Sequence, residues 1–421
     1  MRARCALWIW TLGGLLACSR TGIPVPDAGL AGQDPADAVP CIELPVDGRG
    51  AVVDLSTDAR LRRADVFFLL DTSGSMQQEI GEIRRTLRNE LAPLIGQTFP
   101  DVEFGVGMFS DFPVLDYGAP GDVPFELGLE MTADLGAIQA ALDRVGESSG
   151  LDTPESQVEA LYQVATGEGL GRYVRPSVGC PSGGFGAPCF RTDAEPVVLL
   201  FTDAPFHNGP RDLLGDRYIP GVIRPEPHLY GDALEVLQEH RIRVIGLWSG
   251  EADGSDQEDL ALVAQDTGAL NGRGDPLVFD IGEDGERLGA GVVSSLSDFA
   301  EAAIFDVGVV ALDPEPLDGV DVTAFLAEVR PVATIPDVGA VLDPEAARIL
   351  GVRAGTTVVF EVVLRADAVV PGESPQRFRV RLQFRGDEEI FLGEREVDVV
   401  VPSVTGQGCE VPAEPLERGN Q

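Results

Sequence analysis

Short apolar segments alternate with stretches of helical periodicity from Asp65 to about Phe305, and this alternation narrows the choice of fold more than any other property of the chain. Five of the apolar segments are almost continuous, as strands buried on both faces must be. They are Val66–Leu70, Phe104–Phe109, Val197–Phe201, Val244–Trp248 and Leu277–Phe279. The pattern predicts an α/β domain with a doubly wound, mainly parallel sheet covered by helices on both faces.

Three of the intervening stretches gather their apolar residues on one helical face. The first is Ile80–Leu94, the second is Leu135–Val145 behind Asp134 as an N-cap, and the third is Val158–Ala165 after Pro154. Apolar stripes of this kind face a core. We therefore expect these helices to pack on the sheet.

After about residue 306 the apolar residues recur at every second position instead of at helical spacing. Val358–Leu364 and Arg377–Phe384 alternate apolar with polar residues, which predicts antiparallel strands. Residues 41–62 also have a strand and turn pattern. We expect an N-terminal β-segment at 41–62, the α/β domain at 63–305 and a β-domain at 306–410, followed by a tail at 411–421. The flanking segments would together form a sandwich-like β-domain into which the α/β domain is inserted.

The N-terminus has the pattern of an exported chain. Arg2 and Arg4 precede an apolar run, Ala6–Ala17, which is too short to span a bilayer permanently but suits a secretory signal. The run ends in Leu15-Leu16-Ala17-Cys18, which resembles the lipobox of bacterial lipoproteins. The resemblance implies that a signal peptide, residues 1–17, is removed and that Cys18 carries the lipid.

The residues after Cys18 predict a flexible tether at 18–40, because Pro, Ala, Gly and Asp prevail there. No other stretch of the chain approaches eighteen apolar residues. We therefore expect a protein of the bacterial cell envelope that is lipid-anchored to the outer membrane, facing either the periplasm or the exterior.

The chain has a net charge of -38, from 69 acidic and 31 basic residues. Such a charge repels nucleic acid and anionic lipid head groups. The charge therefore disfavours both as partners, and we expect no nucleic-acid binding.

Four cysteines, Cys41, Cys180, Cys189 and Cys409, follow the export signal, and an even number in an exported chain predicts disulfides. Four cysteines allow three connectivities, and the sequence does not choose among them. Cys180 and Cys189 bracket a short Gly/Pro-rich loop that could close locally, which would leave Cys41 with Cys409. A zinc site is disfavoured, since the spacing is not CxxC and the three histidines are scattered singly.

The segment Asp71-Thr72-Ser73-Gly74-Ser75 follows the first predicted strand, at the sheet edge where open α/β folds bind ligands. The side chains of Asp71, Ser73 and Ser75 alternate and can share one face of the turn. Carboxylate and hydroxyl oxygens suit a hard cation such as Mg²⁺, with Mn²⁺ or Ca²⁺ as alternatives. Because hydroxyls are neutral, the cation stays electrophilic and can accept a further carboxylate.

The DxSxS pattern at 71–75 resembles the metal-ion-dependent adhesion site of von Willebrand factor A domains. Leu151-Asp152-Thr153-Pro154-Glu155 is similar to a loop of the integrin β-subunit I-like domain, and Phe201-Thr202-Asp203 to the strand end that holds the last site aspartate. The resemblance covers about residues 65–300 and implies Glu155 and Asp203 as further metal ligands. Thr153 is the alternative to Glu155, since ordinary A domains use a threonine from this loop.

Ser110-Asp111 resembles the end of the integrin strand that serves a second cation. The resemblance implies a second site formed by Asp111, Asp152 and Glu155. The chain departs from the pattern at Gly150, where the family has asparagine, and at Gln78-Glu79, where it has two acidic residues. The flanking β-regions resemble a reduced integrin hybrid domain.

The expected function is binding, without catalysis. A cation at the 71–75 turn would take an Asp or Glu from a protein partner. A structural envelope protein with stabilising cations is the alternative, and a metal-assisted hydrolase is the third choice. Neither GxSxG nor HExxH occurs, and no recognisable nucleophile turn accompanies His207, His228 or His240.

Overall fold

The structure is a computed structural model that describes residues 41–409 with gaps at 46–48, 147, 149, 181–182, 212–215, 251–254, 283–284, 317–318, 368 and 407. The predicted signal peptide, Cys18, the tether and the tail lie outside the described residues. Among the described helices, none is long and apolar enough to cross a membrane.

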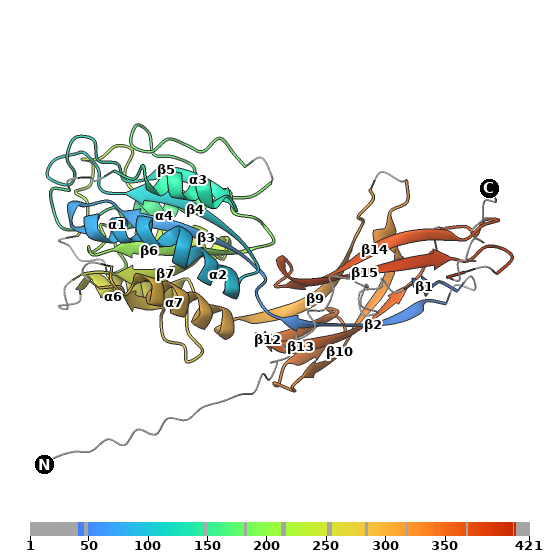
Figure 1. The fold of residues 1–421 in the computed structure, drawn as a ribbon. Coiled ribbons are helices and arrows are strands. Elements are labelled where there is room, and N and C mark those ends of the chain that lie inside the picture. Colours follow the sequence, from blue (N-terminus) through green and yellow to red (C-terminus); the bar gives the residue numbers. More distant parts are fainter. Residues whose placement is uncertain are drawn as a thin grey trace, which may run out of the picture. The chain divides into compact units, whose positions relative to one another are not determined.

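The α/β domain contains a six-stranded sheet with strand order β5-β4-β3-β6-β7-β8 (Figure 1). Its strands are β3 (Arg63–Asp71), β4 (Asp101–Phe109), β5 (Glu126–Thr132), β6 (Glu195–Thr202), β7 (Arg243–Trp248) and β8 (Val278–Asp280). All neighbours are parallel except β5, which is antiparallel to β4. The predicted α/β fold is confirmed. The edge strand β5 was missed because its half-exposed residues form no continuous apolar run.

Helices cover both faces of this sheet, and β3 shows why. Val66, Phe68 and Leu70 belong to one apolar cluster, while Phe67 and Leu69 belong to another, because successive strand residues point to opposite faces. The first cluster contains residues of α1 (Gln77–Thr86), α2 (Ala92–Thr98), α3 (Leu135–Leu142) and α7 (Leu288–Ala302). The second contains residues of α4 (Gln157–Thr166), α5 (Tyr230–Glu239) and α6 (Ser255–Asp266).

The three predicted helices occur with changed bounds. The expected helix Ile80–Leu94 consists of α1, a π-helical turn η3 (Leu87–Leu91) and α2, because Pro93 near the start of α2 lacks the N–H that a continuous α-helix needs. Asp134 caps α3 as predicted, accepting from the backbone N–H groups of Gly136 at 2.8 Å and Ala137 at 3.3 Å. A short 3₁₀ turn, η2 (Gly74–Met76), precedes α1.

The β-domain contains two sheets. The larger has the strand order β1-β15-β14-β9-β12-β11, and the smaller has β10-β13-β2. Their bounds are β1 (Cys41–Glu43), β2 (Ala51–Ala59), β9 (Ile304–Leu312), β10 (Leu326–Ile335), β11 (Val341–Asp343), β12 (Arg348–Arg353), β13 (Thr356–Leu364), β14 (Gln376–Gly386) and β15 (Ile390–Val401), with a 3₁₀ turn η4 (Val322–Phe325) before β10. The sheets are antiparallel except for β1, which is parallel to β15.

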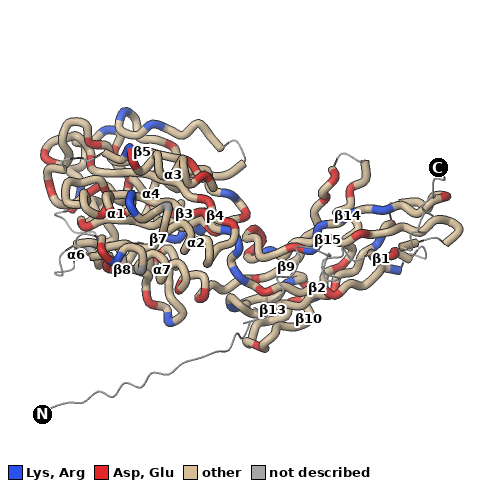
Figure 2. The backbone as a smooth tube through the Cα atoms, in the orientation of Figure 1, with Lys and Arg blue, Asp and Glu red and all other residues tan. Residues whose placement is uncertain are grey.

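The N-terminal segment completes both sheets of the β-domain, since β1 pairs with β15 and β2 pairs with β13. Disulfides join Cys41 to Cys409 and Cys180 to Cys189, the connectivity that local closure of the 180–189 loop favoured. Figure 2 shows Asp and Glu spread along both domains with fewer basic positions among them.

Candidate metal centre

The carboxyl ends of three adjacent parallel strands meet at one edge of the sheet. β3 ends at Asp71, β4 is followed by Asp111, and β6 is followed by Asp203. The chain runs from β3 to β4 on one side and later returns to β6 on the other, so the strand order reverses between β3 and β6. Open α/β sheets bind their ligands at this kind of switch point.

Asp71 is fully buried and its two carboxylate oxygens have different partners. Oδ1 accepts from the Ser73 backbone N–H at 2.9 Å, and Oδ2 accepts from the Thr202 hydroxyl at 2.7 Å. The hydroxyl oxygens of Ser73 and Ser75 lie 3.1 Å apart. Burial, and after it the charge of half-buried Asp203, raises the pKa of Asp71 to about 7. Asp71, Ser73 and Ser75 therefore lie together at this turn, and Asp203 is near enough for its charge to act on Asp71.

Glu155 reaches the same edge from the loop before α4. Its backbone N–H donates to the Pro205 carbonyl at 3.0 Å, and its carbonyl accepts from the His207 N–H at 2.8 Å. This short parallel bridge ties Glu155 to the segment after β6, so α4 begins at Gln157 rather than at Pro154. Burial, followed by the charges of Asp71 and Asp111, raises the pKa of Glu155 to about 10.

The Glu155 carboxylate lies against Gly150, the position where the resemblance would place asparagine. Gly150 has a φ of +51°, and a Cβ added there would lie 2.8 Å from Glu155 Oε1. Glycine thus leaves room for this carboxylate. Among the described residues, the buried Oε2 atom of Glu155 has no hydrogen-bond partner.

These residues fit a divalent cation. Burial and neighbouring carboxylates raise the pKa values of Asp71 and Glu155, and Glu155 Oε2 has no donor among the described residues. A hard cation would supply the missing charge, and hydroxyls and carboxylates are suitable ligands for it. Ser75 is exposed, so the 71–75 turn opens to solvent on one side. Thr153, the alternative ligand, is also exposed on its loop.

A second cluster lies beside the first. The structure brings Asp111 and Asp152 together with His207, whose Nε2 atom is 3.1 Å from Asp111 Oδ2 and 3.3 Å from Asp152 Oδ2. The three potential ligand atoms all lie within 4.8 Å of one another. Glu155, which the resemblance assigned to this site, is not among these three residues, although the charges of Asp111 and Asp152 contribute to its raised pKa.

The partners of His207 and Asp111 fix their orientation. His207 Nδ1 lies 2.7 Å from the Asp216 carbonyl oxygen. Asp111 Oδ1 accepts from the Tyr218 hydroxyl and from the Phe112 N–H. Burial by itself lowers the pKa of His207. The Asp111 and Asp152 carboxylates together outweigh this effect and raise the pKa to about 9.

Three residues at the centre, His207, Thr202 and Tyr218, were not predicted from the sequence. The sequence contained a signal for the first, because His207 follows Asp203 by only four residues in the segment after β6. Neither Thr202 nor Tyr218 has a comparable signal, since each acts through a contact with a distant aspartate. The other histidines lie elsewhere: His228 stacks on Tyr162, and His240 stacks on Phe185.

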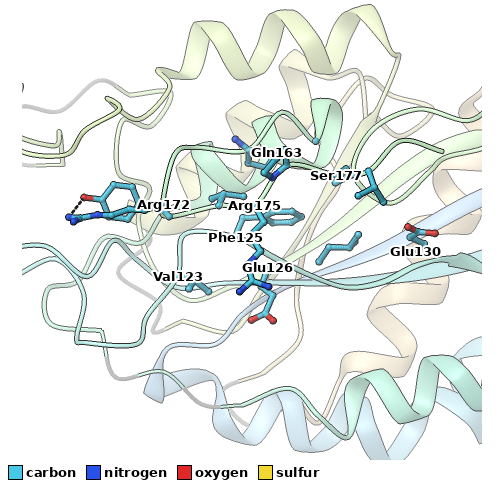
Figure 3. Close-up of a pocket in the computed structure, with 15 residues that line it drawn as sticks. Val123, Phe125, Glu126, Glu130, Gln163, Arg172, Arg175 and Ser177 are labelled. Carbon is cyan, nitrogen blue, oxygen red and sulfur yellow. Dashed lines mark hydrogen bonds between the residues drawn. The ribbon is translucent and has the colours of Figure 1, made fainter.

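A separate cavity of about 550 Å³ lies between β5 and residues 167–178. Figure 3 shows Phe125, which precedes β5, and Glu126, the first residue of β5, on one side of the cavity. Arg175 and Ser177 lie on the other side. None of the residues lining it belongs to the carboxylate clusters, and the described lining residues include neither histidine nor cysteine.

No family model matches the sequence, and no curated protein matches it. Among solved structures, a von Willebrand factor type A protein from Catenulispora acidiphila is 12% identical, with a TM-score of 0.34, and the alignment covers 86% of this chain and 76% of that one. The pilus adhesin SpaC from Lactobacillus rhamnosus GG, in an open conformation, is 11% identical with a TM-score of 0.33. That alignment covers 85% of this chain and 46% of the adhesin.

Proposed function

We propose that the protein is a binding module in which a divalent cation links the 71–75 turn to an acidic group on a protein partner. Mg²⁺ is the proposed ion, with Mn²⁺ or Ca²⁺ as alternatives. The proposed ligands are Asp71, Ser73, Ser75, Glu155 and Asp203. The resemblance of 71–75 to a metal-ion-dependent adhesion site supports the same assignment.

The observation that carries this proposal is the combination of buried carboxyl groups with an exposed rim. Asp71 and Glu155 are buried, with raised pKa values, whereas Gly74 and Ser75 are exposed. A cation at this point would be held from below by carboxylates and reached from solvent on the other side. An incoming Asp or Glu carboxylate could then complete its coordination.

The first test is calorimetric titration of the purified protein with Mg²⁺ and Mn²⁺. Saturable binding by the wild type is expected, with loss of that binding in Asp71→Asn and in Ser73→Ala. Ser297→Ala is the matched control, because this half-buried serine of α7 lies outside the cluster. The proposal fails if the wild type binds neither ion, or if both site variants bind as the wild type does.

Capture of a partner separates binding from a purely structural role for the cation. The proposal predicts that the immobilised wild-type protein retains protein partners in Mg²⁺ and releases them when a chelator is added. A folded Ser73→Ala variant should not retain them. If Ser73→Ala lowers the thermal stability but retains its partners, the cation is structural. We propose no catalytic role.

We also propose that Cys18 carries a lipid that anchors the chain at the outer membrane of the bacterial envelope. Cys18 lies outside the described residues, and the support is the lipobox-like Leu15-Leu16-Ala17-Cys18 sequence. Mass spectrometry of the mature protein should find an acylated N-terminal Cys18, and Cys18→Ser should move the protein from the membrane to the soluble fraction. An unmodified Cys18 in the membrane fraction contradicts the proposal.

A further inference from the structure

We propose that Asp111, Asp152 and His207 form a second metal site, selective for a first-row transition-metal ion of the zinc class. The site is separate from the proposed Mg²⁺ site, since the two share no ligand. It is also distinct from the Asp111, Asp152 and Glu155 set that the sequence implied, because it includes an imidazole.

Two buried atoms of the cluster have no hydrogen-bond partner among the described residues. His207 and Asp111 are 1% and 0% exposed. His207 Nε2 lies at hydrogen-bonding distance from both Asp111 and Asp152, yet neither approach has the alignment of a hydrogen bond. Among the described residues, neither Nε2 nor Asp111 Oδ2 has any other hydrogen-bond partner. These atoms and the Asp152 carboxylate oxygen nevertheless all lie within 4.8 Å of one another.

The spacing of the atoms suits a metal. Nitrogen and oxygen ligands bound at about 2.0–2.2 Å lie roughly 2.9–3.5 Å from one another in tetrahedral or octahedral sites. The two distances from His207 Nε2, 3.1 Å and 3.3 Å, match such ligand separations. The third pair consists of the Asp111 and Asp152 carboxylate oxygens, which lie within 4.8 Å of each other. A small movement of Asp152, whose side chain is 33% exposed, would bring them to the same ligand spacing.

The surrounding contacts orient the ligands as metal sites require. The Asp216 carbonyl can accept a hydrogen bond only from a protonated Nδ1, so a ring that loses one proton to a metal keeps the Nδ1 proton and offers the Nε2 lone pair. The Tyr218 hydroxyl and the Phe112 N–H occupy Asp111 Oδ1, which leaves Oδ2 for the metal. Histidine ligands are typically fixed by such outer hydrogen bonds.

The donor set indicates the class of metal. Mg²⁺ and Ca²⁺ are bound by oxygen, whereas imidazole favours zinc and its neighbours in the first transition series. One imidazole with two carboxylates therefore favours an ion such as Zn²⁺. The carboxylates also balance its charge within a largely buried site.

The test is titration of the purified protein with Co²⁺ in excess Mg²⁺, followed by visible absorption, with Zn²⁺ then added as a competitor. Wild type should bind Co²⁺ stoichiometrically and release it to Zn²⁺. His207→Gln and Asp152→Asn should abolish this uptake, and Tyr218→Phe should weaken it by roughly 10- to 100-fold. Circular dichroism checks the fold of each variant. Asp152→Asn provides a second test should His207→Gln fail to fold, because Asp152 is partly exposed.

Two matched controls separate this site from the proposed function. His240→Gln removes a histidine outside the cluster and should bind Co²⁺ normally, and Ser73→Ala should lose Mg²⁺ binding but keep Co²⁺. No Co²⁺ uptake by wild type overturns the proposal and leaves the cluster as an imidazolium–carboxylate ion pair. Uptake that survives both His207→Gln and Asp152→Asn overturns it as well.

Discussion

Thr202 lies at the end of β6 with its hydroxyl directed at Asp71. The hydroxyl donates to Asp71 Oδ2 at 2.7 Å and accepts from Gln157 Nε2 at 3.0 Å and from the Ala204 N–H at 3.2 Å. This residue is fully buried. A neutral side chain thus orients the carboxylate that we propose as the principal metal ligand.

Thr202→Val keeps the shape of this side chain and removes its hydroxyl. We expect a loss of about 1–3 kcal/mol in the free energy of unfolding, because Asp71 Oδ2 and Gln157 Nε2 each lose a buried hydrogen-bond partner. Mg²⁺ affinity should also fall, since Asp71 is no longer held in position. Urea unfolding and calorimetry measure the two effects. Unchanged stability together with unchanged affinity would contradict the role given to Thr202.

The raised pKa values of Asp71 and Glu155 predict a pH-dependent stability. In the unfolded chain these groups lose their protons near their ordinary pKa values of 3.8 and 4.5, whereas in the metal-free folded protein they retain them up to about 7 and 10. Their contribution to stability is therefore complete below about pH 4 and is lost as the pH rises through the folded values.

Thermal unfolding in chelator should accordingly show a falling melting temperature between about pH 5 and pH 8, and Mg²⁺ should reduce the fall. Mg²⁺ affinity should increase over the same range, because the ion displaces protons. Asp71→Asn provides the control, since it removes the group with the pKa of about 7. A melting temperature that is independent of metal at every pH would contradict this prediction.

At the scale of elements, the segment after β6 positions both clusters, because it contains Asp203 and His207. Its anchor is a paired interaction between Arg211 and Asp259 of α6, with distances of 2.6 Å and 2.8 Å. Asp259 also accepts from the Phe206 N–H at 3.2 Å. The helix therefore holds the loop through one buried carboxylate.

Arg211→Met should destabilise the protein by about 3 kcal/mol, because it leaves Asp259 buried without its charged partner. It should also weaken Mg²⁺ binding through the displaced loop. Arg273→Met is the matched control, because the Arg273–Asp275 pair is exposed, and it should cause no measurable loss. Urea unfolding compares the two variants, and equal effects would contradict the anchoring role.

At the scale of the whole described chain, the β-domain is built from segments on both sides of the α/β domain. β2 pairs with β13, and the Cys41–Cys409 disulfide joins residues that are 368 positions apart. The Cys180–Cys189 disulfide spans only 9 positions. A crosslink that closes a longer loop removes more entropy from the unfolded chain.

The paired change Cys41→Ser and Cys409→Ser should therefore destabilise the protein by up to about 5 kcal/mol, and Cys180→Ser with Cys189→Ser by about 2–3 kcal/mol. Chemical denaturation of the two double variants under the same conditions compares the losses. A larger loss from the short loop would contradict the loop-entropy explanation.

The sequence by itself determined the elements whose composition is dictated by burial. β3, β4, β6 and β7 are apolar along nearly their whole length because both faces of a parallel sheet are covered, and Asp134 identified the start of α3. The edge strand β5, the π-helical turn before Pro93 and the parallel pairing of β1 depend on neighbours, and they were not predicted.

The tertiary structure alone decided which side chains meet. The motif at 71–75 is local, so the sequence could identify it. The resemblance grouped Asp111 with Asp152, but His207 is 96 positions from the first and 55 from the second, and only the fold shows that its imidazole joins them. The convergence arises because parallel strands end at a common edge, and a single loop then brings imidazole and carboxylates within bonding range of one ion.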